Sequence, residues 1–435
     1  MRLFITLAFV VLSCVTSAQQ HVISGPMAGH IDYHEAKIWV QTSGPCLVQI
    51  AYTEINQPSD TLFSNVVGTH LAHACTAHLT CGSLTPGATY SYQLVIDGIR
   101  QMEHYTFHVQ DHWQYCTEPP AFRLAVGSCT YINDPSTDRP GDPYGGGYGI
   151  FDQIASQKPD LMLWLGDNTY FRETDVTSTA GMQYRYTHTR GIPEMQKLLH
   201  TGQHYAIWDD HDYGPDNSNR SFYLKNEALE CFQDFWANPG YGLHENAGVT
   251  TTFSYMDVDF FLLDNRWFRT DPDIQGIEPT ILGEEQILWL IESLKVSTAR
   301  FKVVCMGGQF LSDFAKYENY ALWGAERQRI LDLISDNNIK GVFFLTGDRH
   351  STELSSLKLP SKDMVYDLTV SPLTSTSYDH SKEANHLRVE GTHVGERNFA
   401  ILDFAGDRKD RTLTISVYNG EGELQWEQLI TEEEQ

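Results

Sequence analysis

The chain has 435 residues, a length that suits two domains better than one ordinary single-core domain. Its 30 basic and 56 acidic residues give a net charge of −26, which argues against unaided binding to nucleic acid or to an anionic membrane surface. This charge does not exclude anionic substrates, because bound cations can reverse the local field.

The N-terminal segment has the pattern of an export signal. The sequence MRLFITLAFVVLSCVTSAQQ holds one basic residue, an apolar run and a small-residue site that ends at Ala18. The run is too short to span a membrane, which takes about twenty apolar residues, so residues 1–18 are predicted to be a cleaved secretory signal. A lipoprotein anchor at Cys14 is the lesser alternative, because Leu12 fits such a site poorly. We expect a secreted or periplasmic protein without a transmembrane segment.

Residues 21–118 consist of short alternating segments separated by turns. The sequence LTPGATYSYQL is typical: Pro86 and Gly87 make a turn, and tyrosines then alternate with smaller residues. Several such strands predict a small all-β sandwich of immunoglobulin or fibronectin type. The expected strands are AKIWVQT, CLVQIAYT, TYSYQLVID and HYTFHVQ.

Export favours disulfide formation among the cysteines that follow the signal. Cys75 and Cys81 lie six residues apart in one predicted strand, a span of about 20 Å, so a regular strand keeps them from bridging each other. Pairing among the first four is plausible but its connectivity is open, and the odd count leaves at least one thiol for another role. The seven cysteines are Cys46, Cys75, Cys81, Cys116, Cys129, Cys231 and Cys305.

From residue 119 to residue 435 apolar strands alternate with amphipathic helices, which is typical of an α/β domain. In the helix predicted at 283–296, Ile287, Leu290, Ile291 and Leu294 recur at helical spacing. The other predicted helices are at 148–157, 180–200, 221–236 and 324–336. The predicted strands are FRLAVGS, LMLWLGD, YAIWDD, FFLLDN, FKVVCMG and VFFLTGD.

Four of these strands end in ligand-type or ionisable residues. In open α/β sheets the carboxyl ends of the strands form the edge where ligands bind, so these residues are expected to converge. Three carboxylates and a histidine in four consecutive residues would repel one another unless solvated or neutralised by cations. The residues are Cys129; Asp167 and Tyr170; Asp209, Asp210, His211 and Asp212; and Asp348 and His350.

The ordered motifs resemble the PhoD-like alkaline phosphatases of the calcineurin-like metallophosphoesterase superfamily over nearly the whole mature chain. The resemblance implies that family's four-layer fold, with two sheets between helices, for residues 119–435. The motifs that carry it are VGSC at 126–129, LGDNTY at 165–170, WDDHD at 208–212, LLDNRWFR at 262–269, LGEEQILWL at 282–290 and TGDRH at 346–350.

The same resemblance implies a site with two metal ions. Cys129, Asp167 and Tyr170 match the residues that hold Fe³⁺, and Asp167 also extends toward a position for Ca²⁺. Thiolate and phenolate stabilise ferric iron and carboxylates suit calcium, although the residues alone leave zinc or manganese open. The further expected metal ligands are Asp209, Asp210, Asp348 and His350.

Two features depart from the family pattern. Arg2 stands alone, whereas family members often carry a twin-arginine signal, so Sec-type export is expected. Asp212 stands where the family commonly has glutamate, which leaves the role of that position open.

The implied activity is release of phosphate from organic phosphomonoesters or diesters by metal-activated hydroxide attack. His211 is expected to protonate or stabilise the leaving oxygen. Arg266 and Arg269 are candidates for clamping phosphate oxygens, and structural ion pairs are the equal alternative.

The sequence leaves two alternative functions open. One is a phosphodiesterase or phospholipase D-type hydrolase, because this kind of site can cleave both ester classes. The other, less favoured, is a non-catalytic calcium-dependent envelope-binding protein. Small phosphoesters are the expected partners, nucleic acid is not, and the sequence does not define the oligomeric state.

Overall fold

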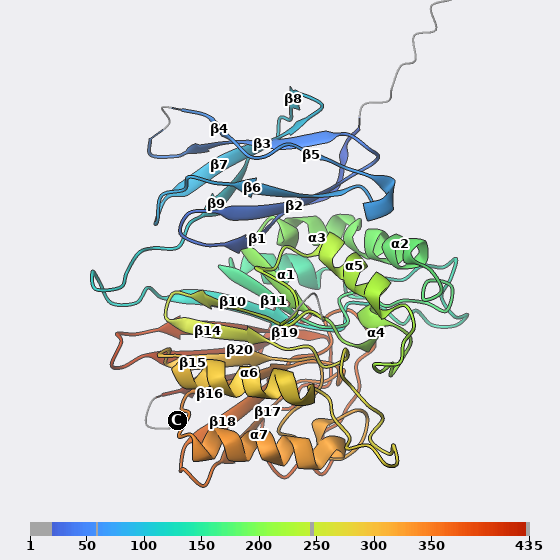
Figure 1. Ribbon diagram of the computed structural model, residues 1–435, viewed down its shortest axis with the longest axis vertical. Coiled ribbons are helices and arrows are strands. Elements are labelled where there is room, and N and C mark those ends of the chain that lie inside the picture. The colour runs from blue at the N-terminus through green and yellow to red at the C-terminus, as the bar shows by residue number, and fades with distance from the viewer. Residues whose placement is uncertain (1–19, 58–59, 244–247, 432–435) are drawn as a thin grey trace, which may run out of the picture.

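The computed structural model describes residues 20–57, 60–243 and 248–431 (Figure 1). The predicted secretory signal, residues 1–18, lies outside this part of the chain. Within the described ranges, no helix is both long enough and apolar enough to cross a membrane.

The first hundred or so residues are rich in strands, as predicted. In β7 every second side chain is buried, which follows from the alternation in TYSYQLVI. A six-stranded sheet has the order β4-β3-β7-β8, with β5 paired to β3 and β9 paired to β7. The elements are β1 (Val22–Ile31), β2 (Ala36–Thr42), β3 (Leu47–Glu54), β4 (Leu62–Phe63), β5 (Val67–Gly68), the 3₁₀ helix η1 (Leu71–His73), β6 (Thr76–Cys81), β7 (Thr89–Ile96), β8 (Ile99–Arg100) and β9 (Tyr105–His108).

The other three N-terminal strands belong to a larger sheet. Its nine strands have the order β21-β20-β19-β10-β11-β12-β1-β2-β6, and β1 joins β12 in parallel at Ala28 and Gln203. One face of β1, β2 and β6 packs on β3 and β7, while the other face contributes Met27 and Trp39 to the core beneath the helices. A separate immunoglobulin-like sandwich is therefore not established, because the N-terminal strands continue a sheet of the α/β part.

The α/β part contains the six strands that the sequence predicted, now β10, β11, β12, β14, β15 and β16. A second sheet has the order β13-β14-β15-β16-β18-β17. The strands are β10 (Phe122–Gly127), β11 (Leu161–Leu165), β12 (Gln203–Ile207), β13 (Thr251–Tyr255), β14 (Val258–Leu262), β15 (Phe301–Cys305), β16 (Val342–Thr346), β17 (Glu353–Lys358), β18 (Met364–Thr369), β19 (Asn398–Ala405), β20 (Thr412–Asn419) and β21 (Leu424–Ile430).

Helices cover the outer faces of the two sheets. One core lies between the sheets, a second lies under α1, α2, α3 and α5, and a third lies under α6 and α7. This is the layering of two sheets between helices that the resemblance implied. The helices are α1 (Ile150–Ser156), α2 (Thr179–Arg190), α3 (Pro193–Leu199), α4 (Asp210–Tyr213), α5 (Lys225–Phe235), α6 (Gly283–Val296), the 3₁₀ helix η2 (Tyr320–Trp323) and α7 (Gly324–Asp336).

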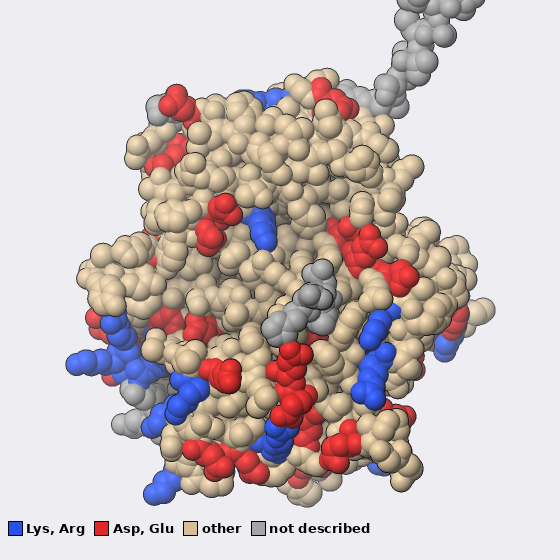
Figure 2. Space-filling view, viewed as in Figure 1, with Lys and Arg blue, Asp and Glu red and all other residues tan. Residues whose placement is uncertain are grey.

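The seven described cysteines are all free. Cys116 is exposed and the other six are buried, so the pairing that was considered among the first four is not found. Charged side chains are unevenly distributed: on the face in Figure 2 they gather over the α/β part, while the N-terminal sheets show few.

Candidate metal centre and active site

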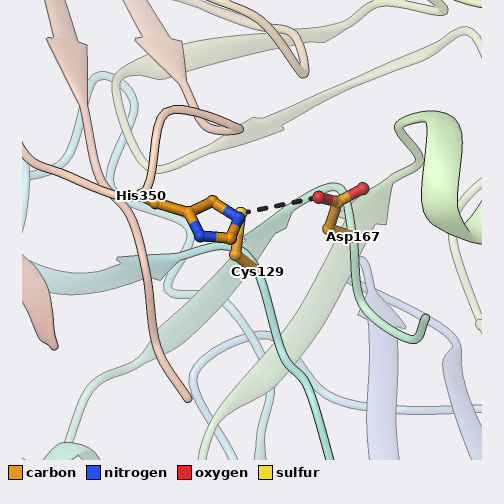
Figure 3. Close-up of side chains that lie close together, drawn as sticks. All are labelled: Cys129, Asp167 and His350. Atoms are coloured by element: carbon orange, nitrogen blue, oxygen red, sulfur yellow. Dashed lines mark hydrogen bonds between the residues drawn. The ribbon is translucent and has the colours of Figure 1, made fainter. Parts of the chain in front are cut away.

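The residues that end β10, β11 and β16 meet at the carboxyl edge of the two sheets. One ligand atom each from Cys129, Asp167 and His350 lies within 4.8 Å of the others (Figure 3). The Cys129 Sγ is 3.6 Å from an Asp167 carboxylate oxygen and also accepts a hydrogen bond from the Ser371 hydroxyl at 3.1 Å. Three sequence-distant segments thus supply one cluster, as predicted.

Asp167 also belongs to a second cluster. This second cluster consists of Asp167, Asp210 and His211. A third cluster consists of Asp209, Asp210 and Asp348. In each, the ligand atoms lie within 4.8 Å of one another. The three clusters share members and are therefore contiguous. The predicted ligands Cys129, Asp167, Asp209, Asp210, Asp348 and His350 all lie in this connected set.

Glycines bring these strand ends together. A Cβ on Gly166, whose φ is +89°, would lie 2.7 Å from the Asp209 Cβ. A Cβ on Gly307, which follows β15, would lie 2.5 Å from the Asp209 carboxyl carbon. Both positions need glycine because a side chain would displace Asp209.

Several of the predicted ligands have an unusual backbone conformation. Cys129, Asp167, Asp348 and His350 have φ values of +60°, +51°, +69° and +54°, in the left-handed region. This backbone conformation is unfavourable for residues other than glycine. Non-glycine residues that adopt it cluster at functional sites, where the surrounding structure holds them in place. Their concentration at one sheet edge indicates a site under functional constraint.

The carboxylates lie deep and close together. Burial, followed by repulsion from neighbouring thiol and carboxylate groups, raises the pKa of Asp167 well above its ordinary value. Burial and the charges of Asp209 and Asp210 raise the pKa of Asp348 to about 8. Burial also raises the pKa of the Cys129 thiol to about 12. The protein alone therefore stabilises these anions poorly, and bound cations would reverse the effect.

Hydrogen bonding in the cluster is incomplete. Among the described residues, one oxygen of Asp209 and one of Asp210 are buried without a hydrogen-bond partner, and the oxygen of Asp210 lies 3.6 Å from Arg266 Nη2. Buried polar atoms are normally paired, so an unpaired carboxylate oxygen calls for a ligand. Carboxylates beside a thiol, an imidazole and a phenol form a donor set that fits both a hard cation and a ferric ion.

Tyr170 lies against the first cluster. Its phenol oxygen is 3.2 Å from His350 Nε2, and its ring centroid is 4.2 Å from that of His211. The side chain is 3% exposed, and burial raises the pKa of its phenol well above the ordinary value. The ring fixes the position of two predicted site histidines.

Arg266 and Arg269 face carboxylates. Arg266 is fully buried, ion-pairs with Asp209 and places Nη2 2.7 Å from Glu318 Oε2. Arg269 ion-pairs with the other oxygen of Glu318. This geometry favours the structural alternative for both arginines, since their donors are directed at protein groups.

A cavity of about 420 Å³ opens over the cluster. Glu318 and Arg349 are among the lining residues for which the sequence predicted no role. Arg349 lies within the TGDRH motif, so its position was visible in the sequence, whereas Glu318 lies in a loop without a recognisable motif. Asp212 is buried and accepts hydrogen bonds from the backbone of Asp209 and Asn168, so it supports the loop that carries the cluster.

Comparisons with known proteins give matches over both parts of the chain. A family model described as PhoD-like phosphatase matches residues 124–408, and a model described as a domain of unknown function (DUF7800) matches residues 19–113. Alkaline phosphatase D of Bacillus subtilis (strain 168) is 24% identical over 336 residues, covering 66% of this chain and 58% of that relative. The chain thus spans less than two thirds of the length of that relative.

Two solved structures share the fold. The structure of PhoD has a TM-score of 0.74 at 16% identity and covers 93% of this chain and 91% of its own. A purple acid phosphatase from yellow lupin (Lupinus luteus) seeds has a TM-score of 0.68 at 11% identity. This match covers 93% of the present chain and 74% of the lupin chain. Because the family model spans well over half of the residues, the chain belongs to the PhoD-like phosphatase family.

Proposed function

We propose that the protein is a metal-dependent hydrolase that releases phosphate from organic phosphomonoesters or diesters. The observation that carries this proposal is the convergence of Cys129, Asp167, Asp210 and Asp348 on contiguous clusters with buried carboxylate oxygens that lack a hydrogen-bond partner. The membership of the PhoD-like phosphatase family supports the same reaction class.

We assign Cys129, Asp167, Tyr170 and His350 to a ferric position, and Asp167, Asp209, Asp210 and Asp348 to a calcium position. When bound, cations there supply Lewis-acid chemistry for phosphoryl oxygens and for a water molecule. The thiol and phenol suit Fe³⁺, while an all-carboxylate set suits Ca²⁺. A visible absorption band that disappears in Tyr170→Phe is expected for the iron position, and a colourless wild-type protein containing only zinc contradicts it.

His211 is the residue proposed to deliver a proton. Its ring is partly exposed in the cavity, next to Tyr170, and its Nε2 lies 3.6 Å from an oxygen of Asp216. In the reaction the bond between phosphorus and the leaving oxygen breaks, and that oxygen takes the proton from His211. The water that attacks phosphorus supplies the oxygen that remains on the released phosphate. The proton that this water loses passes to solvent, from which His211 is reprotonated.

Arg349 is positioned to orient the phosphoryl group. It lines the cavity, and Glu383 accepts from its Nη2 at 2.8 Å. Arg266 instead holds Asp209 in place from behind. A guanidinium at the cavity wall can donate to phosphoryl oxygens.

Replacement of Asp167 tests the assignment directly. Because Asp167 belongs to both the first and the second cluster, Asp167→Asn is expected to lose bound metal and to lower kcat by at least about a thousandfold. Elemental analysis and turnover of 4-nitrophenyl phosphate measure the two effects on one preparation. Asp407→Asn, in the turn between β19 and β20, is the matched control. Wild-type turnover and metal content in Asp167→Asn would refute the assignment.

We also propose Sec-type export, on the pattern of residues 1–18 alone. N-terminal sequencing of the protein recovered outside the cytoplasm is expected to begin immediately after Ala18. A protein retained in the cytoplasm with Met1 intact would contradict this proposal.

A further inference from the structure

A second cavity lies beside the cavity of about 420 Å³ over the cluster, which we call the metal cavity, and it adjoins His211. It has a volume of about 540 Å³ and is lined from residues 131–144, 170–176 and 211–216; we call it the side pocket. Tyr144, His211 and Asp216 line both cavities. A leaving group that takes its proton from His211 would therefore have the side pocket next to it.

The walls of the side pocket are aromatic. The ring centroid of Tyr131 lies 4.8 Å from that of Tyr144 and 5.1 Å from that of Tyr170. Pro140, Pro143 and Phe171 also line the pocket. Apolar walls with a few polar groups are typical of sites for small organic ligands.

Buried polar contacts fix the loop that forms one wall. Asp134 accepts hydrogen bonds from Ser136, Tyr184 and Arg185, and these contacts hold the pKa of its carboxyl below the ordinary value although burial opposes them. Asp138 accepts from the Tyr131 hydroxyl at 2.8 Å. The wall is thus formed before any ligand enters.

The pocket carries excess negative charge. Its lining includes four carboxylates and two guanidiniums, which leaves two negative charges when His211 is neutral and one when His211 carries the proton that it donates. Arg172 pairs with Asp138 and Arg139 pairs with Glu173, each at 2.9 Å. The remaining carboxylates are Asp142 and Asp216. Within the described ranges, Asp142 has no ion-pair partner, and the only one of Asp216 is His211.

Resting on the proposed function, we propose that the side pocket is a leaving-group subsite for alcohols that carry a positive charge next to apolar surface, such as amino alcohols. The Asp142 and Asp216 carboxylates would attract such a cation, and the tyrosine rings would contact its apolar part. An anionic leaving group would be repelled by the same carboxylates. The phosphoryl group itself would remain in the metal cavity.

Matched substrates isolate the charge. Choline phosphate and 3,3-dimethylbutyl phosphate have nearly the same shape and differ in a nitrogen cation against a neutral carbon. We define the charge preference as the ratio of their kcat/KM values, measured with the metal-loaded, full-length mature protein. Any difference in intrinsic reactivity between the two esters cancels when this ratio is compared between variants.

In Asp142→Asn the charge preference is expected to fall about three- to fivefold, the range for a partly exposed charge pair. Asp142→Lys is expected to lower it further. Asp407→Asn, at the opposite edge of the sheet, should leave it unchanged. Turnover of the neutral ester shows that each variant is folded and metal-loaded.

Two results would overturn the inference: an unchanged charge preference in both Asp142 variants, or a wild-type protein that cleaves 4-nitrophenyl phosphate but neither of the matched esters. A metal-loaded protein that cleaves no phosphoester at all would instead overturn the proposed function. The two failures are thus distinguishable.

Discussion

Arg266 and Asp209 form an ion pair behind the candidate metal centre, and both side chains are almost completely buried. Glu318 contacts the same guanidinium and also pairs with Arg269. In this network Arg266 is the cation that compensates the protein carboxylates nearest to it. Arg349 also pairs with a carboxylate, that of Glu383, but it differs from Arg266 and Arg269 in lining the cavity.

Removal of Arg266 is therefore expected to affect stability more than substrate binding. Arg266→Gln leaves the buried Asp209 and the partly buried Glu318 without a full countercharge, a change that costs about 3–5 kcal/mol. Urea denaturation of the metal-loaded protein measures it. Arg329→Gln removes an exposed pair with Glu284 and is expected to leave the free energy of unfolding almost unchanged. If Arg266→Gln instead raised KM strongly and left the free energy of unfolding unchanged, Arg266 would be a phosphate-clamping residue.

The sequence predicted individual site residues where a ligand-type or ionisable side chain comes directly after a buried strand. Cys129, Asp167, Asp210 and Asp348 could be named because each follows an apolar run that ends at the same sheet edge. Glu318 could not, since its loop has no periodic pattern. The roles of the arginines could not be decided either, because a guanidinium binds phosphate and carboxylate equally well.

At the scale of elements, the junction between β1 and β12 shows how the N-terminal strands join the α/β part. The two strands pair at Gln203, and beyond it the Asn238 side chain takes over: its amide donates to the Ala206 carbonyl at 2.8 Å and accepts from the Ala206 N–H at 3.1 Å. A side chain thus satisfies the backbone of β12 where β1 diverges.

Asn238→Ala is expected to destabilise the protein by about 2–4 kcal/mol, because two buried backbone groups of Ala206 lose their partners. Thermal or urea denaturation measures the change. Asn337→Ala, which removes one half-buried bond to the end of α7, serves as the comparison and should cost about 1 kcal/mol. Equal effects of the two replacements would argue against the bridging role of Asn238.

The predicted strands and most predicted helices of the α/β part agree with the structure because their periodicity is strong, as in α6, where Ile287, Leu290 and Leu294 are all buried. The single helix predicted at 180–200 is wrong: it is two helices, α2 and α3, because the chain leaves the helical conformation before Pro193, which begins the second helix. The continuation of its sheet into β1 was not predictable. It depends on one parallel pairing between residues 175 positions apart, Ala28 and Gln203, and alternation within β1 does not identify its neighbour.

At the scale of the whole molecule, the two sheets deliver their strand ends to one edge, and this concentrates charge. Figure 1 shows β10 and β11 of the first sheet above β14, β15 and β16 of the second, with α4 at the end where the site lies. Asp209 and Asp348 come from different sheets, so their repulsion opposes the packing of the sheets at this edge. Cations bound there would convert that repulsion into attraction.

The stability of metal-free protein should therefore depend on pH. The folded-state pKa of Asp348 is about 8, above its ordinary value of 3.8, because of burial and the nearby carboxylates. This group favours the folded state fully below about pH 4, and the contribution is lost as the pH rises to about 8. The Tm of chelator-treated protein should fall over this window, and Asp348→Asn should reduce the slope. Added calcium should raise the Tm most at alkaline pH. If neither Asp348→Asn nor calcium changed the dependence of Tm on pH, this electrostatic account would be contradicted.

The most direct test of the central claim is the rate of hydrolysis of 4-nitrophenyl phosphate and bis(4-nitrophenyl) phosphate before chelation, after chelation and after cations are returned. The account predicts turnover of at least one ester, its loss on chelation, and its recovery with iron and calcium. Turnover that persists in protein shown by elemental analysis to be metal-free would contradict it. So would a fully metal-loaded protein that hydrolyses neither ester.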